Sequence, residues 1–242
     1  MGRVLGTLFW IAIAIWAACW WRYDRFADDL VLRSEVEREP VQRRTRMATF
    51  DTEQGGVRYQ VRPQYDYELY GLVVSKRVHD GQFGLHRLWN DNLNIADLCV
   101  VWGSNARALD LNEFSFSSGQ FTCYFFTRSR AAWAAFAPAR MSDNHLLVDK
   151  DWLRYDIDNV EIGDQVRLMG VLAEYAIGAT FRRGTSTTRT DTGDGACETI
   201  YVQSLQLLQP METIWRTLYT PAWVMALVSA GLWLFGVLRG RW

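Results

Sequence analysis

Two uncharged apolar runs, one near each end of the chain, constrain its fold more than any other feature. Residues 4–21 have the sequence VLGTLFWIAIAIWAACWW, and residues 217–238 have the sequence TLYTPAWVMALVSAGLWLFGVL. Each run is close to the roughly 20 apolar residues that cross a ~30 Å hydrocarbon core as a helix. The residues between the runs are mostly polar. The sequence therefore predicts one extramembrane domain flanked by an N-terminal and a C-terminal transmembrane helix.

The flanks of the two runs indicate whether the first is retained and which way the chain faces. Trp16 and Ala18 make a poor small-x-small cleavage pair, so we expect the first helix to remain uncleaved. Arg3 precedes the first run, while Arg239 and Arg241 follow the second. Because positive charges on short flanks favour the cytoplasm, we expect both termini there, the helices in a bacterial inner membrane, and the domain in the periplasm.

The overall charge and composition exclude several classes of protein. The net charge is −1 and the mean hydropathy is −0.12, which fits neither a polytopic transporter nor a basic nucleic-acid-binding protein. No Walker or dinucleotide-binding glycine motif is present in the sequence. We therefore expect no cofactor and no nucleic acid partner. The expected partners are the lipid bilayer and other membrane or envelope proteins.

The sequence divides into four parts. Residues 1–21 are the first transmembrane helix, and residues 22–56 are a charged linker in which Asp28 to Glu39 could extend that helix until Pro40 ends it. Residues 57–210 are the predicted domain. Residues 211–242 form the second transmembrane helix and a cytoplasmic tail.

The domain has the pattern of a mainly β structure. Polar and apolar residues alternate from Val57 to Val74, as they do in a half-buried strand. Ala96 to Trp102 is a short apolar run, Gln165 to Tyr175 has Gly170 at its middle, and Glu198 to Leu208 alternates again. Several short strands with glycine-broken middles predict a small barrel or sandwich, and an OB-like barrel is one such form.

Two polar segments are candidates for a functional surface. Ser142 to Leu147 and Arg182 to Glu198 combine histidine, arginine, hydroxyl and carboxylate side chains, and both are interpreted as loops. Arginine pairs and glycine-rich backbone could hold an anionic ligand. We expect a non-catalytic function in binding or in membrane-complex assembly. The candidate binding residues are Asn144, His145, Arg183, Thr188, Arg189 and Asp191.

An enzyme is the alternative. His145 could act as a general base with Asp191 or Glu198 as its partner, although the simpler interpretation of His145 is a loop histidine. The residues around Ser118 do not form a nucleophile elbow, so a serine hydrolase has no support. There is no CxxC pair, and we predict no metal site.

The cysteines allow at most one disulfide within the domain. Cys19 lies in the first apolar run, which leaves Cys99, Cys123 and Cys197. Cys99 lies in the apolar run 96–102 and is interpreted as a buried small hydrophobic residue. Cys123 and Cys197 are therefore the predicted pair.

Several motifs together resemble a family of uncharacterised bacterial membrane-anchored proteins. They are ADLCVVWG (96–103), FSSGQFTCY (116–124), NHLL (144–147), GDQVRLMG (163–170) and RGTSTTRTDTGDGACETIYV (183–202). The family has no assigned activity, so the resemblance implies no substrate. Family members have SNNHLL where this chain has Asp143 in SDNHLL. The resemblance implies that the shared motifs include Cys123, Asn144, His145, Arg189, Asp191 and Cys197.

Overall fold

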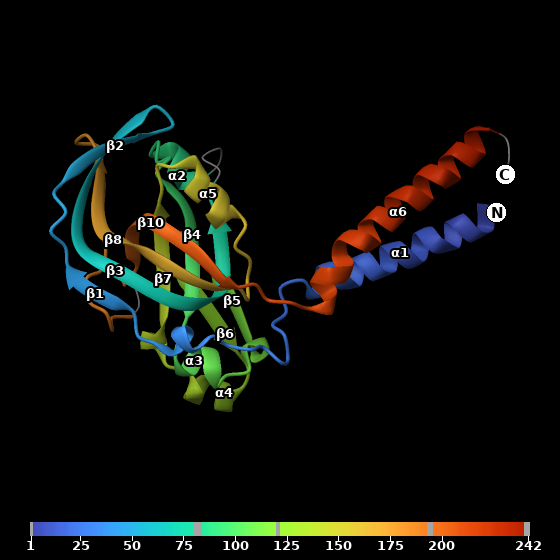
Figure 1. Cartoon of the computed structure of the whole chain (residues 1–242), viewed down its shortest axis with the longest axis horizontal. Coiled ribbons are helices and arrows are strands. Elements are labelled where there is room, and N and C mark those ends of the chain that lie inside the picture. The colour runs from blue at the N-terminus through green and yellow to red at the C-terminus, as the bar shows by residue number, and fades with distance from the viewer. Residues whose placement is uncertain (1, 80–83, 120–121, 193–195, 240–242) are drawn as a thin grey trace. The chain divides into compact units, whose positions relative to one another are not determined.

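The computed structural model describes residues 2–79, 84–119, 122–192 and 196–239 (Figure 1). The chain forms two units. One unit comprises Met1–Leu30 and Met211–Trp242, and the other comprises Val31–Pro210. The first unit contains the two apolar helices, and the second contains the β domain.

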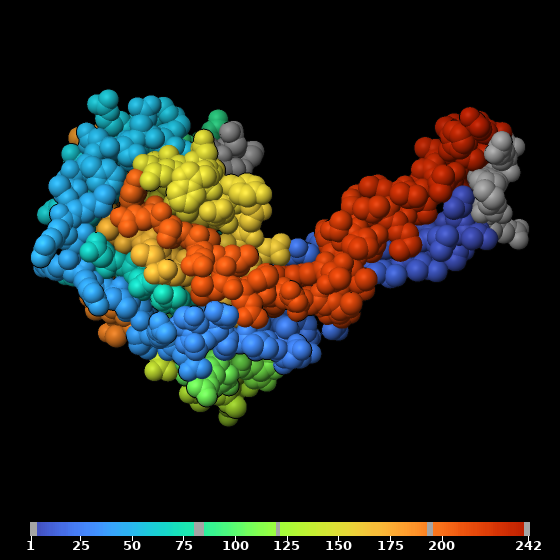
Figure 2. Space-filling view, viewed as in Figure 1, coloured from blue at the N-terminus to red at the C-terminus, as the bar shows by residue number. Residues whose placement is uncertain are grey.

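The first unit is a pair of long apolar helices that pack side by side (Figures 1 and 2). They are α1 (Gly2–Arg22) and α6 (Ile214–Leu238). The ring centroid of Trp16 lies 5.2 Å from that of Trp223, and the ring of Tyr23 lies 5.1 Å from that of Tyr219, so the helices run antiparallel. Both are long and apolar enough to cross a membrane, and most of their side chains are exposed. The predicted helix at each end of the chain is confirmed.

The second unit is built mainly from strands. In chain order its elements are η1 (Ser34–Glu37), β1 (Val41–Arg44), β2 (Phe50–Gln54), β3 (Val57–Val78), α2 (Gly84–Leu88), β4 (Asn94–Val101), α3 (Ser104–Arg107), η2 (Leu111–Glu113), β5 (Phe114–Ser118), β6 (Cys123–Thr127), α4 (Arg130–Ala135), η3 (Pro138–Arg140), β7 (Met141–Leu147), α5 (Asp151–Asp158), β8 (Gln165–Ile177), β9 (Phe181–Arg183) and β10 (Glu198–Gln209).

Among the described residues, eight strands form one mixed sheet, and β5 and β6 form a separate hairpin. The long strand β3 pairs antiparallel with β4 and also with β8. β4 pairs antiparallel with β7, β7 pairs in parallel with β10, and β10 pairs antiparallel with β8. β1 and β2 both pair with β3, and β9 pairs with β8. The last strand of the chain, β10, therefore lies between two earlier ones.

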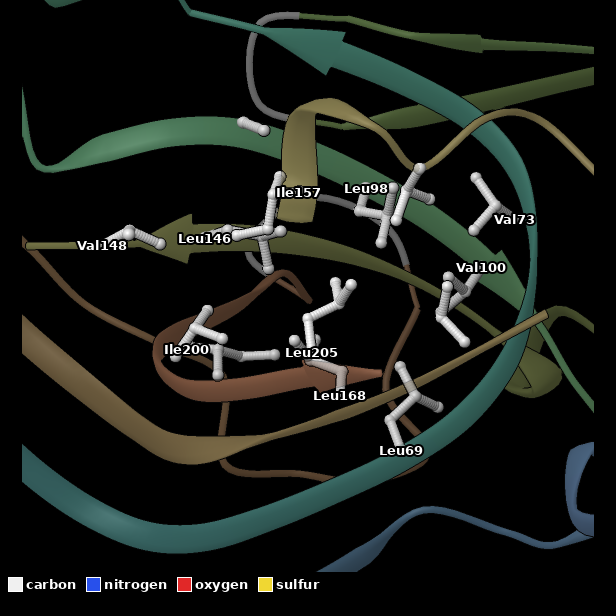
Figure 3. Close-up of a cluster of buried hydrophobic side chains, with 14 of the residues drawn as sticks. Leu69, Val73, Leu98, Val100, Leu146, Val148, Ile157, Leu168, Ile200 and Leu205 are labelled. Carbon is white, nitrogen blue, oxygen red and sulfur yellow. The ribbon is translucent and has the colours of Figure 1, made fainter. Parts of the chain in front are cut away.

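Alternate side chains of the long strands meet in one apolar cluster (Figure 3). β3, β4, β7, β8 and β10 each contribute at least one fully buried residue, and these include Leu69, Leu98, Leu146, Leu168 and Ile200. Helix α5, which follows β7, adds further side chains to the same cluster. Burying one such side chain contributes roughly 1.5–3 kcal/mol. The opposite face of β8 and β10 packs into a second apolar cluster, which includes Val171 and Tyr201.

Gly170 of β8 lies close against the backbone of β10. A Cβ added at Gly170 would lie 2.3 Å from the backbone carbonyl oxygen of Tyr201. We expect Gly170→Ala to lower the free energy of unfolding by about 1–3 kcal/mol, because two paired strands would have to separate locally. Chemical denaturation of the full chain in detergent measures this change. Gly184→Ala is the control, since a Cβ there meets no atom within 4 Å, and an equal loss in both variants would contradict the steric explanation.

The segment from Ser142 to Leu147 is a strand, so its interpretation as a loop was wrong. It forms most of β7, and every residue from Ser142 to Leu147 is buried. Its polar side chains are tolerated inside the domain because neighbouring strands supply hydrogen-bond partners. Polar residues in this segment indicate a buried network instead of an exposed surface.

The charged segment after the first helix also differs from the prediction. α1 ends at Arg22, and the only helical turn between Asp28 and Glu39 is the 3-10 turn Ser34–Glu37. Strands β1 and β2 lie within residues 22–56 and pair with β3. The segment therefore begins the β domain and does not extend the helix.

Candidate ligand-binding site

A buried carboxylate and a buried imidazole face each other on neighbouring strands. Asp97 of β4 and His145 of β7 are directly paired in the antiparallel register. Since Leu98 and Leu146 point into the apolar cluster, Asp97 and His145 lie on the opposite face. His145 Nδ1 lies 2.5 Å from Asp97 Oδ1. The acid beside His145 is therefore Asp97. The enzyme alternative had named Asp191 or Glu198 as this partner, and that expectation was wrong.

Asp97 also contacts a second histidine. Its Oδ2 lies 3.0 Å from His79 Nε2, and the ring of His79 stacks on that of His86 with centroids 3.9 Å apart. Burial alone would raise the pKa of the Asp97 carboxyl, but hydrogen bonds from His145 and His79 outweigh burial and hold that pKa well below its usual range. Asp97 is thus an ionised carboxylate shared by two imidazoles.

The other nitrogen of His145 faces an arginine. Arg183 Nη2 lies 2.7 Å from His145 Nε2. Because a guanidinium group can only donate hydrogen bonds, Nε2 is the acceptor and the proton of the ring is on Nδ1, where Asp97 accepts it. Asp97, His145 and Arg183 therefore form a continuous hydrogen-bonded chain from a buried carboxylate to a half-buried guanidinium.

Backbone contacts hold Arg183 in this place. Arg183 ends β9 and pairs with Tyr175 of β8. After it, Thr199 donates its hydroxyl to the carbonyl of Gly184 at 2.8 Å, and Thr185 accepts a hydrogen bond from the Thr199 amide at 2.9 Å. These contacts fasten the segment after β9 to the start of β10.

A second carboxylate and a thiol lie beside His145 on the same face. Asp143 precedes His145 by two residues on β7, and the thiol of Cys197 lies 3.7 Å from Asp143 Oδ2. Burial raises the pKa of the Asp143 carboxyl to about 6, and burial likewise raises the pKa of the Cys197 thiol. The thiol and the carboxyl are thus both displaced toward their protonated forms.

The disulfide joins Cys99 to Cys123, so the predicted Cys123–Cys197 pair was wrong. Cys99 is buried, as expected, but it lies on the same face of the sheet as Asp97 and not in the apolar cluster. The β5–β6 hairpin brings Cys123 to that face. Cys197 remains a thiol next to Asp143.

An open cavity of about 620 Å³ borders this polar chain. Its wall combines two arginines, several hydroxyls and two aromatic rings. The rings of Trp89 and Phe181 have centroids 5.5 Å apart and form one part of the wall. The residues that line it are Trp89, His145, Thr180, Phe181, Arg182, Arg183, Gly184, Thr185, Ser186, Cys197 and Thr199.

The other predicted binding residues lie away from this cavity wall. Asn144 points the opposite way from His145 and donates to the Leu98 carbonyl at 3.0 Å. Asp191 accepts the Ser186 hydroxyl at 2.5 Å, and the amide of Thr188 donates to that same hydroxyl at 3.1 Å. These contacts shape the segment after β9 from within.

Arg189 fastens the same segment to the rest of the domain. Its Nη2 lies 2.5 Å from Glu39 Oε2, and its guanidinium carbon lies 5.2 Å from the centre of the Trp102 ring. Glu39 also accepts a hydrogen bond from Trp102 Nε1 at 3.0 Å. Of the predicted binding residues, only His145 and Arg183 are brought together at the cavity.

Asp97 was missed as a site residue, although the sequence contains a signal for it. It is the only charged residue in the apolar run 96–102. An acidic side chain in a buried strand requires a partner, since an unpaired buried charge is costly. The partner is remote in sequence and becomes evident only from the pairing of β4 with β7.

Comparisons of the chain with protein-family models, with curated proteins and with solved structures give no match. The functional argument therefore rests on the residues of the site.

Proposed function

We propose that the chain is a bitopic protein of a bacterial inner membrane that holds a ligand-binding β domain in the periplasm. The antiparallel packing of α1 and α6 supports this. Two antiparallel helices that both span a membrane place both chain ends on the same side of it. The arginines at both outer flanks favour the cytoplasm for that side. A disulfide in the domain fits an oxidising compartment.

We infer that the mixed sheet closes into an OB-like barrel. The strand pairings support this, since the order β3, β4, β7, β10, β8 returns to β3. A helix between the third and fourth of these strands in the chain, α5, fits the same architecture. OB folds bind ligands on the face of the second and third strands and with the loops beside it. Here that face belongs to β4 and β7, which carry Asp97 and His145.

The ligand that fits the cavity best is a small anion with an apolar ring. The observation that carries this proposal is the hydrogen-bonded Asp97–His145–Arg183 chain at the cavity wall. It presents a guanidinium group in fixed orientation, and guanidinium groups bind carboxylates and phosphates. Trp89 and Phe181 provide an aromatic surface for the ring. His145 Nε2 already accepts from Arg183, which favours a binding role over a general-base role.

Phenyl phosphate and inorganic phosphate test this function. We expect phenyl phosphate to raise the melting temperature of the full chain in detergent more than inorganic phosphate does, because only phenyl phosphate has a ring for Trp89 to contact. Trp89→Ala should remove this difference between the two probes. Arg182→Gln should weaken the response to both probes, since Arg182 lines the cavity.

Arg62→Gln is the matched control for Arg182→Gln. Both arginines are largely exposed and pair with Oε2 of Glu174, at 3.9 and 3.7 Å, but only Arg182 lines the cavity. Phosphate responses that are equal in the two variants, or absent in the native chain, would refute the proposal.

A further inference from the structure

Three side chains beside the cavity form a set of ligands that suits a transition metal ion. Asp143, His145 and Cys197 each offer one ligand atom, and these atoms all lie within 4.8 Å of one another. A carboxylate oxygen, an imidazole nitrogen and a sulfur are the ligands that Zn²⁺ accepts in proteins. The sequence indicated no metal site because Cys197 is remote from the other two residues and no CxxC pair is present.

The distance between two of these ligand atoms fits a tetrahedral ion. Zinc bonds of about 2.3 Å to sulfur and about 2.0–2.2 Å to oxygen place the two ligand atoms about 3.5 Å apart. The sulfur of Cys197 lies 3.7 Å from Asp143 Oδ2. An ion between them would need only a small adjustment of either side chain.

His145 is already oriented as a metal ligand. Metal-binding histidines commonly donate their second ring N–H to a carboxylate, which fixes the ring and directs the other nitrogen to the ion. Asp97 accepts from His145 Nδ1 at 2.5 Å, so the lone pair of Nε2 points away from Asp97. The cationic guanidinium of Arg183 lies 2.7 Å from this lone pair. A cation therefore already occupies the place that a metal ion bound by Nε2 would take.

We propose that Asp143, His145 and Cys197 bind a zinc-like divalent ion, with Asp97 as the positioning residue behind His145. Two of the three ligands, His145 and Cys197, line the open cavity, which gives the ion a route in and leaves its fourth coordination position accessible. Arg183 must turn into the cavity when the ion binds. This proposal goes beyond anion binding and does not depend on it.

Metal binding is measured on the full chain in detergent micelles, purified through a histidine-free tag and treated with a chelator. We expect calorimetry to show one Zn²⁺ per chain. We expect Co²⁺ to give tetrahedral visible bands together with a near-ultraviolet thiolate-to-cobalt band.

Cys197→Ser should abolish the thiolate band and weaken Zn²⁺ binding by about 100-fold, since it replaces the thiolate with a poor ligand. Cys19→Ser is the matched control, because Cys19 is the other cysteine outside the disulfide.

Arg183→Ala provides a test that unfolding cannot imitate. Removing the competing guanidinium should tighten Zn²⁺ binding by roughly tenfold, the equivalent of about 1.4 kcal/mol. Stoichiometric binding with a thiolate band that Cys197→Ser removes, together with tighter binding in Arg183→Ala, would support the site. Absence of stoichiometric binding, a thiolate band that persists in Cys197→Ser, or unchanged affinity in Arg183→Ala would each overturn it.

Discussion

Glu198→Gln is expected to stabilise the domain strongly in alkaline solution and to leave its stability unchanged in acid. Burial raises the pKa of Glu198 from its ordinary 4.5 to about 8. Between these values the folded chain holds a proton that the unfolded chain has released. The contribution of Glu198 to stability is therefore greatest below pH 4.5 and falls as the pH rises toward 8. The difference between the ordinary and the raised pKa of Glu198 corresponds to roughly 4 to 5 kcal/mol in the free energy of unfolding.

Glutamine imitates the protonated acid and has no charge to bury, so the variant should lack this loss above pH 8. The charged groups acting on Glu198 are Arg189, which favours its ionisation, and Asp191 and Asp143, which oppose it. The measurement is chemical denaturation of the full chain across this pH range, with a chelator present. Asp143→Asn is the comparison. Burial raises the pKa of Asp143 from 3.8 to about 6, so this variant should change the slope of the profile only between those values and leave a constant difference above them. Parallel profiles for the native chain and Glu198→Gln would contradict the prediction.

Asp97→Asn is expected to destabilise the domain by about 3 kcal/mol, because a buried hydrogen bond to a charged acceptor contributes roughly 1.5–3 kcal/mol. The carboxylate accepts from His145 with one oxygen and contacts His79 with the other. An amide has one acceptor oxygen, and its NH₂ group would face the second imidazole. The variant thus leaves a buried donor without an acceptor. The shift of the urea midpoint for the full chain in detergent measures the loss.

Asp66→Asn is the control for Asp97→Asn. Asp66 is an exposed carboxylate on β3, and its substitution should change stability by less than about 0.5 kcal/mol. A loss for Asp97→Asn no greater than that for Asp66→Asn would show that the two histidines do not depend on the carboxylate.

The strands were predictable from the sequence because their apolar alternation is local. The predicted strand that starts at Val57 became β3, the run Ala96 to Trp102 became β4, and the last two segments became β8 and β10. In each of them, apolar residues at alternate positions pack in a buried cluster, and Tyr59 and Val61 of β3 belong to a second such cluster, so the pattern reports the burial directly.

The candidate site was only partly predictable, because its contacts join residues far apart in the chain. His145 and Arg183 were selected for their chemistry, and the structure brings them together. Asp97 and the Cys99–Cys123 pair depend on which strands lie side by side, and composition contains no such information. The polar residues of β7 were misinterpreted as a loop for the same reason, since their partners are on other strands.

The place of β10 in the sheet sets the order in which the domain can be made. β10 pairs with both β7 and β8, yet it is the last strand of the chain. During synthesis the edges of β7 and β8 that pair with β10 stay unpaired until Gln209 has been added, because a non-local pairing forms only once both strands exist. Helix α6 begins at Ile214, directly after that point. The sheet is thus completed as the last long helix is being produced, so a delay in delivering that helix would prolong the exposure of an unfinished domain.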